Sequence, residues 1–338
     1  MKTLEVVTEH TTPFKVLFEV LKDMITETNI EFRSMPKKKP LEDADSDDET
    51  PDKKKKKEEK DCMRITAIDP TKTVLVHLKL DGCNFSKFIC KQPKLNIGVS
   101  LGCFYKLIKS MGKNDILTLS VDHDKKNYLN IKIDSPDEKK DSEFNLKLLD
   151  IDETKTAIPD ITFDAIITMD SQEFNKLCRE MNNIADYVEI RCLPDKVIFR
   201  CEGDFADRKT TYRTQGAKDP KDSKDKSKDK EKEKEKEKES ESNDNILVNI
   251  NHASTQTKDN TAPQIVQGIF ELKHLVLFSK CASLSNDIEI YMKNDFPLVI
   301  KYQVATLGRI LLCLTPIKED TTKNTCYSDE EEFYSDEE

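Results

Sequence analysis

Residues 12–28 read TPFKVLFEVLKDMITET, and the spacing of their apolar residues predicts an amphipathic helix. Thr12 is the expected N-cap and Pro13 the expected first helical residue, where a missing N–H costs little. The apolar residues recur three and four positions apart, which places them on one helix face. They are Phe14, Leu17, Phe18, Leu21, Met24 and Ile25.

The same arrangement occurs three more times. A second helix is expected from Ser100, a third from Asp170 or Ser171, and a fourth over about residues 271–283. One apolar residue in each helix serves as a marker: Phe14, Phe104, Phe174 and Leu272. When the two Lys-rich blocks described below are left out, successive markers lie 64, 70 and 70 residues apart. This regularity predicts four copies of one helix-plus-strands unit.

Short alternating or β-branched runs separate the helices and predict strands. Four helices, each followed by several strands, indicate the α+β class. The expected strands are residues 3–7, 73–80, 115–121, 128–133, 163–169, 188–191, 196–201, 288–292 and 298–303.

Charge is concentrated in three blocks that offer little to bury. Residues 35–60 and 217–244 mix Lys with acidic residues, and residues 319–338 are acidic. We expect two disordered insertions and a disordered tail, with a solvated single helix as the alternative for the second block. Together the blocks account for −9 of the formal net charge of −10. The rest of the chain is near neutral, so only the local placement of Lys and Arg bears on a nucleic-acid partner.

No pattern in the chain predicts catalysis, a cofactor or a metal. The ten Cys are scattered singly, as reduced core residues are, and none lies at zinc-ligand spacing. The five His have no neighbouring nucleophile, and no glycine-rich phosphate loop is present. Asp150, Asp152 and Glu153 are interpreted as an acidic linker rather than a metal site. No apolar run approaches the ~18 residues that a membrane span needs.

Each helix carries two basic residues away from its apolar side, three or seven positions apart. On one helix such a pair is an ordinary solvated face. Four repeats favour a sequence-independent contact with phosphates. Apart from Tyr105, no aromatic residue interleaves with the cations, as stacking on single-stranded bases requires. We therefore expect eight residues to contact the backbone of double-stranded DNA: Lys15, Lys22, Lys106, Lys109, Lys176, Arg179, Lys273 and Lys280.

Several strings, in this order and at this spacing, resemble the proliferating cell nuclear antigen family over nearly all of the chain outside the charged blocks. In the first half they are VLKDMI at residues 20–25, AID at 67–69, VLVHL at 74–78, IGVSL at 97–101 and KLIK at 106–109. In the second half they are LLDID at 148–152, AIP at 157–159, EF at 173–174, LCR at 177–179, DFPLVIKY at 295–302 and LTPI at 314–317.

This resemblance implies a DNA clamp fold, with two similar domains per chain and two helices in each. Three chains would close a pseudo-sixfold ring with the helices facing inward. The implied divisions are an N-terminal domain at 1–146, a connector at 147–160, a C-terminal domain at 161–318 and the tail at 319–338. The ring would close by pairing of residues 143–147 with residues 209–213 of the next subunit. The interface side chains would include Phe144, Leu146, Thr210 and Tyr212.

The resemblance also implies an apolar pocket beneath the connector that captures peptides from partner proteins. Two departures from the family alter its rim, since Lys72 replaces a histidine and Cys313 replaces an aromatic residue. Arg208 stands where the interface loop often has glycine. The matching pocket positions are Ile68, Lys72, Leu75, Ile158, Pro159, Phe163, Pro297, Leu314, Thr315 and Pro316.

The implied function is that of a sliding clamp, a processivity factor that encircles duplex DNA and is not an enzyme. Its implied partners are a DNA polymerase, an ATP-dependent clamp loader, other replication and repair enzymes with peptide motifs, and further copies of itself in a homotrimer. The expected location is the nucleus or a viral replication compartment. The alternatives are a specialised subunit of a heteromeric checkpoint or transcription ring, and a charged scaffold that binds nucleic acid through its Lys runs.

Overall fold

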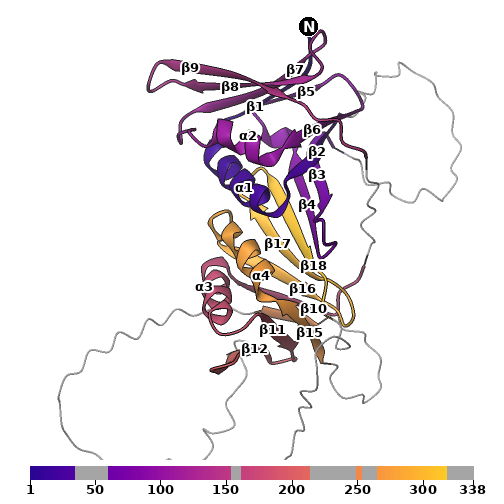
Figure 1. Cartoon of the computed structure of the whole chain (residues 1–338), viewed down its shortest axis with the longest axis vertical. Helices are drawn as coiled ribbons and strands as arrows, with labels where there is room; N and C mark the ends of the chain where they lie inside the picture. The colour runs from indigo at the N-terminus through magenta and orange to yellow at the C-terminus, as the bar shows by residue number, and fades with distance from the viewer. Residues whose placement is uncertain (35–59, 154–160, 214–248, 253–264, 318–338) are drawn as a thin grey trace, which may run out of the picture.

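The computed structural model describes residues 1–34, 60–153, 161–213, 249–252 and 265–317 (Figure 1). The expected insertions at 35–60 and 217–244 and the tail at 319–338 lie outside the described residues, apart from Lys60. The same holds for the part of the connector from residue 154 to residue 160.

Eighteen strands and four α-helices follow one another in two similar halves of the described chain. The first half contains β1 (Lys2–Thr8), α1 (Thr11–Met24), β2 (Glu27–Arg33), β3 (Cys62–Ile68), β4 (Val74–Asp81), β5 (Lys87–Cys90), β6 (Lys94–Ser100), α2 (Leu101–Ile108), β7 (Ile116–Asp122), β8 (Tyr128–Ser135) and β9 (Lys140–Lys147). The second half contains β10 (Ala165–Asp170), α3 (Ser171–Asn182), β11 (Tyr187–Cys192), β12 (Lys196–Glu202), β13 (Asp207–Arg213), β14 (Asn249–His252), β15 (Val266–Glu271), α4 (Leu272–Ser279), β16 (Asp287–Met292), β17 (Leu298–Val304) and β18 (Gly308–Leu314).

Three antiparallel sheets and one layer of helices make up the described residues, so the α+β class is confirmed. The central sheet has the order β14-β10-β16-β17-β18-β4-β3-β2-β6 and joins the two halves by pairing β18 with β4. A five-stranded sheet, β5-β1-β7-β8-β9, lies at one end of the elongated molecule. A four-stranded sheet, β13-β12-β11-β15, lies at the other end (Figure 1).

The four helices lie in a column on one face of the central sheet (Figure 1). Along β4, buried Val74, Val76, Leu78 and Leu80 alternate with partly exposed residues. Since successive side chains of a strand point to opposite faces, the buried set faces the helices. The partly exposed set lies on the other side, which we call the outer face.

Helix α1 differs at both ends from the expectation. It begins at Thr11 rather than after a Thr12 cap, and His10 precedes it without a side-chain capping bond. Pro13 still falls in the first turn, where no intrahelical donor is needed. The helix ends at Met24 and Ile25 is extended, because β-branched Ile25, Thr26 and Thr28 lead into β2.

The other helices begin as expected. Helix α2 follows Ser100, and α3 is capped by Asp170, whose Oδ1 accepts a bond of 2.8 Å from the Glu173 N–H. Helix α4 continues as a 3-10 turn over Lys280–Ser283. Aromatic packing joins α1 to α2, since the Phe104 ring lies 4.7 Å from Phe18 and 6.4 Å from Phe14 between centroids.

Candidate nucleic-acid and partner interfaces

The eight basic residues expected to contact DNA all lie on the helix layer. Six of the side chains are exposed, and those of Lys15 and Lys22 are half-buried. The apolar stripe of each helix is buried against the sheet. The exposed cations therefore lie on the side of the helix layer that faces away from the sheet. The structure therefore brings these residues to one surface.

Four of the eight cations have partners among the described residues. The Lys15 Nζ donates to the Met111 carbonyl at 2.6 Å, and the Lys273 Nζ lies 2.7 Å from the Glu271 carboxylate. The remaining two, Lys22 and Lys280, share one acidic partner. Each of these partners competes with a phosphate for the cation that it holds.

Asp23 holds both Lys22 and Lys280. Its Oδ1 lies 2.6 Å from the Lys22 Nζ and its Oδ2 lies 2.8 Å from the Lys280 Nζ. Burial alone would raise the pKa of Asp23, but the bonds from the two lysines lower it below its ordinary value. The second contact joins residues 257 positions apart, so no sequence pattern predicts it.

Lys106, Lys109, Lys176 and Arg179 are exposed and form no ion pair with a described residue. The neighbouring acidic side chains of α3 are occupied by β13. The Tyr212 hydroxyl donates to the Glu173 carboxylate at 2.8 Å, and the Arg208 guanidinium contacts Glu180 at 2.7 Å. Strand β13 thus leaves the cations of α3 available.

The strands expected to join subunits are both sheet edges. Strand β9 pairs only with β8, and β13 pairs only with β12, among the described residues. Two other edges are partly covered, because Leu149 donates to the Gly98 carbonyl of β6 and Ile317 to the Ile269 carbonyl of β15. Strands β5 and β14 have four residues each, whereas β9 has eight and β13 seven. The two longest uncovered edges of the described chain therefore lie at its opposite ends.

The four expected interface side chains also serve their own subunit. Phe144 and Leu146 are partly buried against the core. Tyr212 contacts the Phe199 ring at 5.9 Å between centroids and bonds to α3. Arg208 bonds to Glu180 and Thr210 of the same chain.

A row of apolar side chains crosses the outer face of the central sheet, and we call it the apolar row. Ile68 is paired with Leu75, Leu75 with Cys313, and Cys313 with Val299. Tyr291 extends the row, and the Phe163 ring lies 5.3 Å from it between centroids. Ile68 is 44% exposed, so this end of the apolar row is accessible to solvent.

The apolar row includes only part of the expected pocket. Leu314 is fully buried and faces the helices, one residue out of phase with the outer face, and Cys313 takes the outer position. Thr315 is exposed and bonds to the Thr73 carbonyl. Lys72 is exposed in a turn with φ 59°, and Pro297 and Pro316 are half-buried. Ile158 and Pro159 lie outside the described residues.

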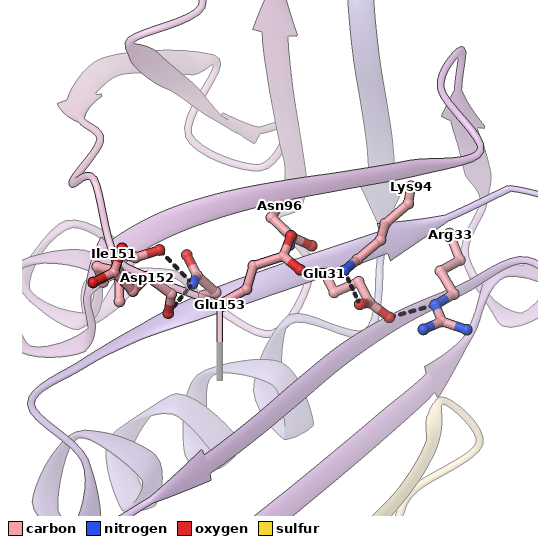
Figure 2. A network of polar contacts seen from close by, with 8 residues as sticks. Glu31, Arg33, Lys94, Asn96, Ile151, Asp152 and Glu153 are labelled. Carbon is pink, nitrogen blue, oxygen red and sulfur yellow. Dashed lines mark hydrogen bonds and ion pairs between the residues drawn. The ribbon is translucent and has the colours of Figure 1, made fainter. Parts of the chain in front are cut away.

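The start of the connector is anchored on the outer face at β2 and β6 (Figure 2). Asn29 donates to the Ile151 carbonyl at 2.9 Å, and Lys94 contacts Glu153 at 2.8 Å. Asn96 also donates to Glu153. A Cβ atom on Gly98 would lie 2.2 Å from the Leu149 carbonyl oxygen, so the connector crosses β6 where no side chain is present.

A polar pocket of about 270 Å³ separates this anchored segment from the apolar row. Within it, Arg64 Nε and Asn96 Oδ1 are buried without hydrogen-bond partners in the described chain. The lining residues are Glu27, Thr28, Asn29, Glu31, Arg64, Thr66, Ala67, Ile68, Lys94, Asn96, Ile151, Asp152 and Glu153.

The part of the chain that the structure describes contains no cluster of three or more His, Cys, Asp or Glu side chains suited to a metal ion. None of its helices is long and apolar enough to cross a membrane.

Comparisons with known proteins place the chain in a family. The model of the proliferating cell nuclear antigen N-terminal domain matches residues 53–156, and that of the C-terminal domain matches residues 157–234 and 242–317. A probable DNA polymerase sliding clamp of Acanthamoeba polyphaga mimivirus is 28% identical over 330 residues, which cover 94% of this chain and 62% of the relative. A probable DNA polymerase sliding clamp 1 of Paramecium bursaria Chlorella virus 1 is 30% identical over 259 residues, 75% of this chain and 84% of the relative. The chain belongs to the proliferating cell nuclear antigen family.

Proposed function

We propose that this protein is a sliding clamp that encircles duplex DNA and increases the processivity of a DNA polymerase. The observation that carries the proposal is the layer of four helices with exposed cations on one side of a sheet. A helix face with Lys and Arg meets phosphates without reading bases, so the protein can hold DNA and still slide. The two viral relatives whose names describe a DNA polymerase sliding clamp support this function.

The ring is proposed to be a homotrimer closed by β9 of one subunit and β13 of the next. Both are long uncovered edges at opposite ends of the described chain, so head-to-tail pairing can continue around a closed ring. A clamp loader driven by ATP would open and close it. Polymerase, replication and repair enzymes would bind through peptides at the apolar row, in the nucleus or a viral replication compartment.

Two measurements test this function. Light scattering should give a mass of about 117 kDa, three times the 38.9 kDa of one chain. Polymerase extension on a primed single-stranded circle should yield longer products per binding event when the protein and a clamp loader are present. A persistent monomer, or product lengths unchanged by the protein, would reject the proposal. A mixed ring that forms only with a different subunit would favour the heteromeric alternative.

A further inference from the structure

Three basic residues lie side by side on the outer face of the central sheet, away from the helix layer. Arg64 of β3 is paired with Lys79 of β4, and Lys79 is paired with Arg309 of β18. We call these three residues the cationic row. Like charges directly opposite one another on a sheet are destabilising, so the arrangement is unfavourable without an anion.

The described chain neutralises this row only in part. Lys79 lies 3.5 Å from Asp81, whereas Arg64 and Arg309 form no ion pair with a described residue. Glu31 is paired with Arg64 across the strands, but its carboxylate contacts Arg33 at 2.5 Å and Lys94 at 3.3 Å instead. Arg64 Nε is a buried donor without an acceptor.

The positive charge of the row also affects the pKa of His77. It lies between the cationic row and the apolar row on β4, and its Nδ1 is 3.0 Å from the Thr66 hydroxyl. Burial lowers the pKa of His77 to about 4, and the charges of Arg64, Arg309 and Lys79 contribute to the decrease.

The cationic row and the apolar row share one surface. On β4 they are represented by Lys79 and Leu75, and on β18 by Arg309 and Cys313. Four residues along a strand correspond to about 13 Å, so one extended peptide of five or six residues can reach both rows. Asp81, which lies beside Lys79 in the row, opposes a longer polyanion such as duplex DNA.

We propose that the cationic row binds an acidic peptide segment of a partner protein whose apolar residues occupy the neighbouring apolar row. This inference rests on the proposed function, because it specifies the chemistry of the partners that the clamp would recruit. Arg64 and Arg309 can each hold a carboxylate through two parallel bonds, and Lys79 adds a third charge. Partners of this protein would therefore carry Asp or Glu about 13 Å from their apolar anchor.

The test is fluorescence anisotropy with the full chain and a labelled peptide of alternating Gly and Glu at low ionic strength. The outer variant R64Q/K79Q/R309Q should bind at least about tenfold more weakly than the unaltered protein. The matched control K106Q/K109Q/K176Q removes the same charge from the helix layer and should bind the peptide as the unaltered protein does. Thermal unfolding should show both variants folded, since Gln preserves most of each side-chain stem.

Four results would overturn the proposal. The first two are peptide binding by the outer variant as tight as that of the unaltered protein, and loss of peptide binding by the control. The third is loss of binding to a 20-base-pair duplex by the outer variant. The fourth is a rise of tenfold or more in peptide affinity when the chain is ended at residue 317. The last result would identify the chain's own acidic residues 319–338 as the occupant. Polymerase processivity, measured without the peptide, reports separately on the proposed function.

Discussion

Asp23→Asn should strengthen the binding of duplex DNA. The carboxylate now holds Lys22 at 2.6 Å and Lys280 at 2.8 Å. The amide keeps the shape of the side chain but removes the charge that competes with a phosphate for both lysines. Two further cations per chain then become available on the helix layer.

The expected magnitude follows from the release of counterions. Each phosphate neutralised by Lys or Arg contributes about 0.9 to the slope of log affinity against log salt concentration. The variant should therefore steepen this slope by up to about 1.8 per chain. The loss of ion pairs should cost less than about 1 kcal/mol of folding stability, because the three side chains are partly exposed.

The assay is equilibrium binding of a 30-base-pair duplex at several KCl concentrations between 50 and 200 mM. Saturation of the binding curve is checked at each KCl concentration. Asp81→Asn is the matched control, since it makes the same chemical change beside Lys79 on the outer face. It should leave the slope unchanged. If both variants behaved alike, or if Asp23→Asn weakened binding, the inward role of Lys22 and Lys280 would be refuted.

Three further predictions concern stability. Gly98→Ala should lower the free energy of unfolding by about 2 kcal/mol, because its Cβ would lie 2.2 Å from the Leu149 carbonyl oxygen. The control is Gly102→Ala on α2, whose Cβ would contact nothing, and which should be neutral or stabilising in thermal unfolding. Phe104→Ala should cost about 3–5 kcal/mol in denaturant unfolding by leaving a cavity beside Phe14 and Phe18, while Cys103→Ala at an exposed position should stay within about 0.5 kcal/mol. As the pH falls from 6.5 to about 4, His77 takes up a proton in the unfolded chain but not in the folded one. The free energy of unfolding should therefore decrease over this range by up to about 3 kcal/mol more in the unaltered protein than in His77→Gln. Parallel pH profiles of the two proteins would contradict this.

The helices were the most predictable part of the fold. Their apolar residues recur at helical spacing, and the buried residues of α3, such as Phe174, Leu177 and Met181, are those the pattern indicates. The end of α1 was wrong because Met24 and Ile25 continue the helical spacing although β-branched residues follow. Strand β2 was missed for the same reason, since the expected helix ran across its first residues.

In the candidate sites, the features that lie within one helix or strand were predictable, and the contacts between elements were not. The basic residues of α2 and α3 are exposed on the expected side. The partner of Lys22 and Lys280 was not predictable, because Asp23 meets Lys280 only after the two halves pack together. Leu314 was placed on the wrong face because strand phase depends on the register with β4. The cationic row likewise exists only after β3, β4 and β18 pair.

The central claim is that the protein surrounds duplex DNA rather than adhering to its side. The most direct measurement follows protein loaded by a clamp loader onto a nicked circular plasmid, before and after the plasmid is cut once with a restriction enzyme. A closed ring should remain on the circle at a salt concentration that screens the helix cations and should leave within minutes once free ends exist. Equal rates of loss from the circular and linear DNA would contradict encirclement.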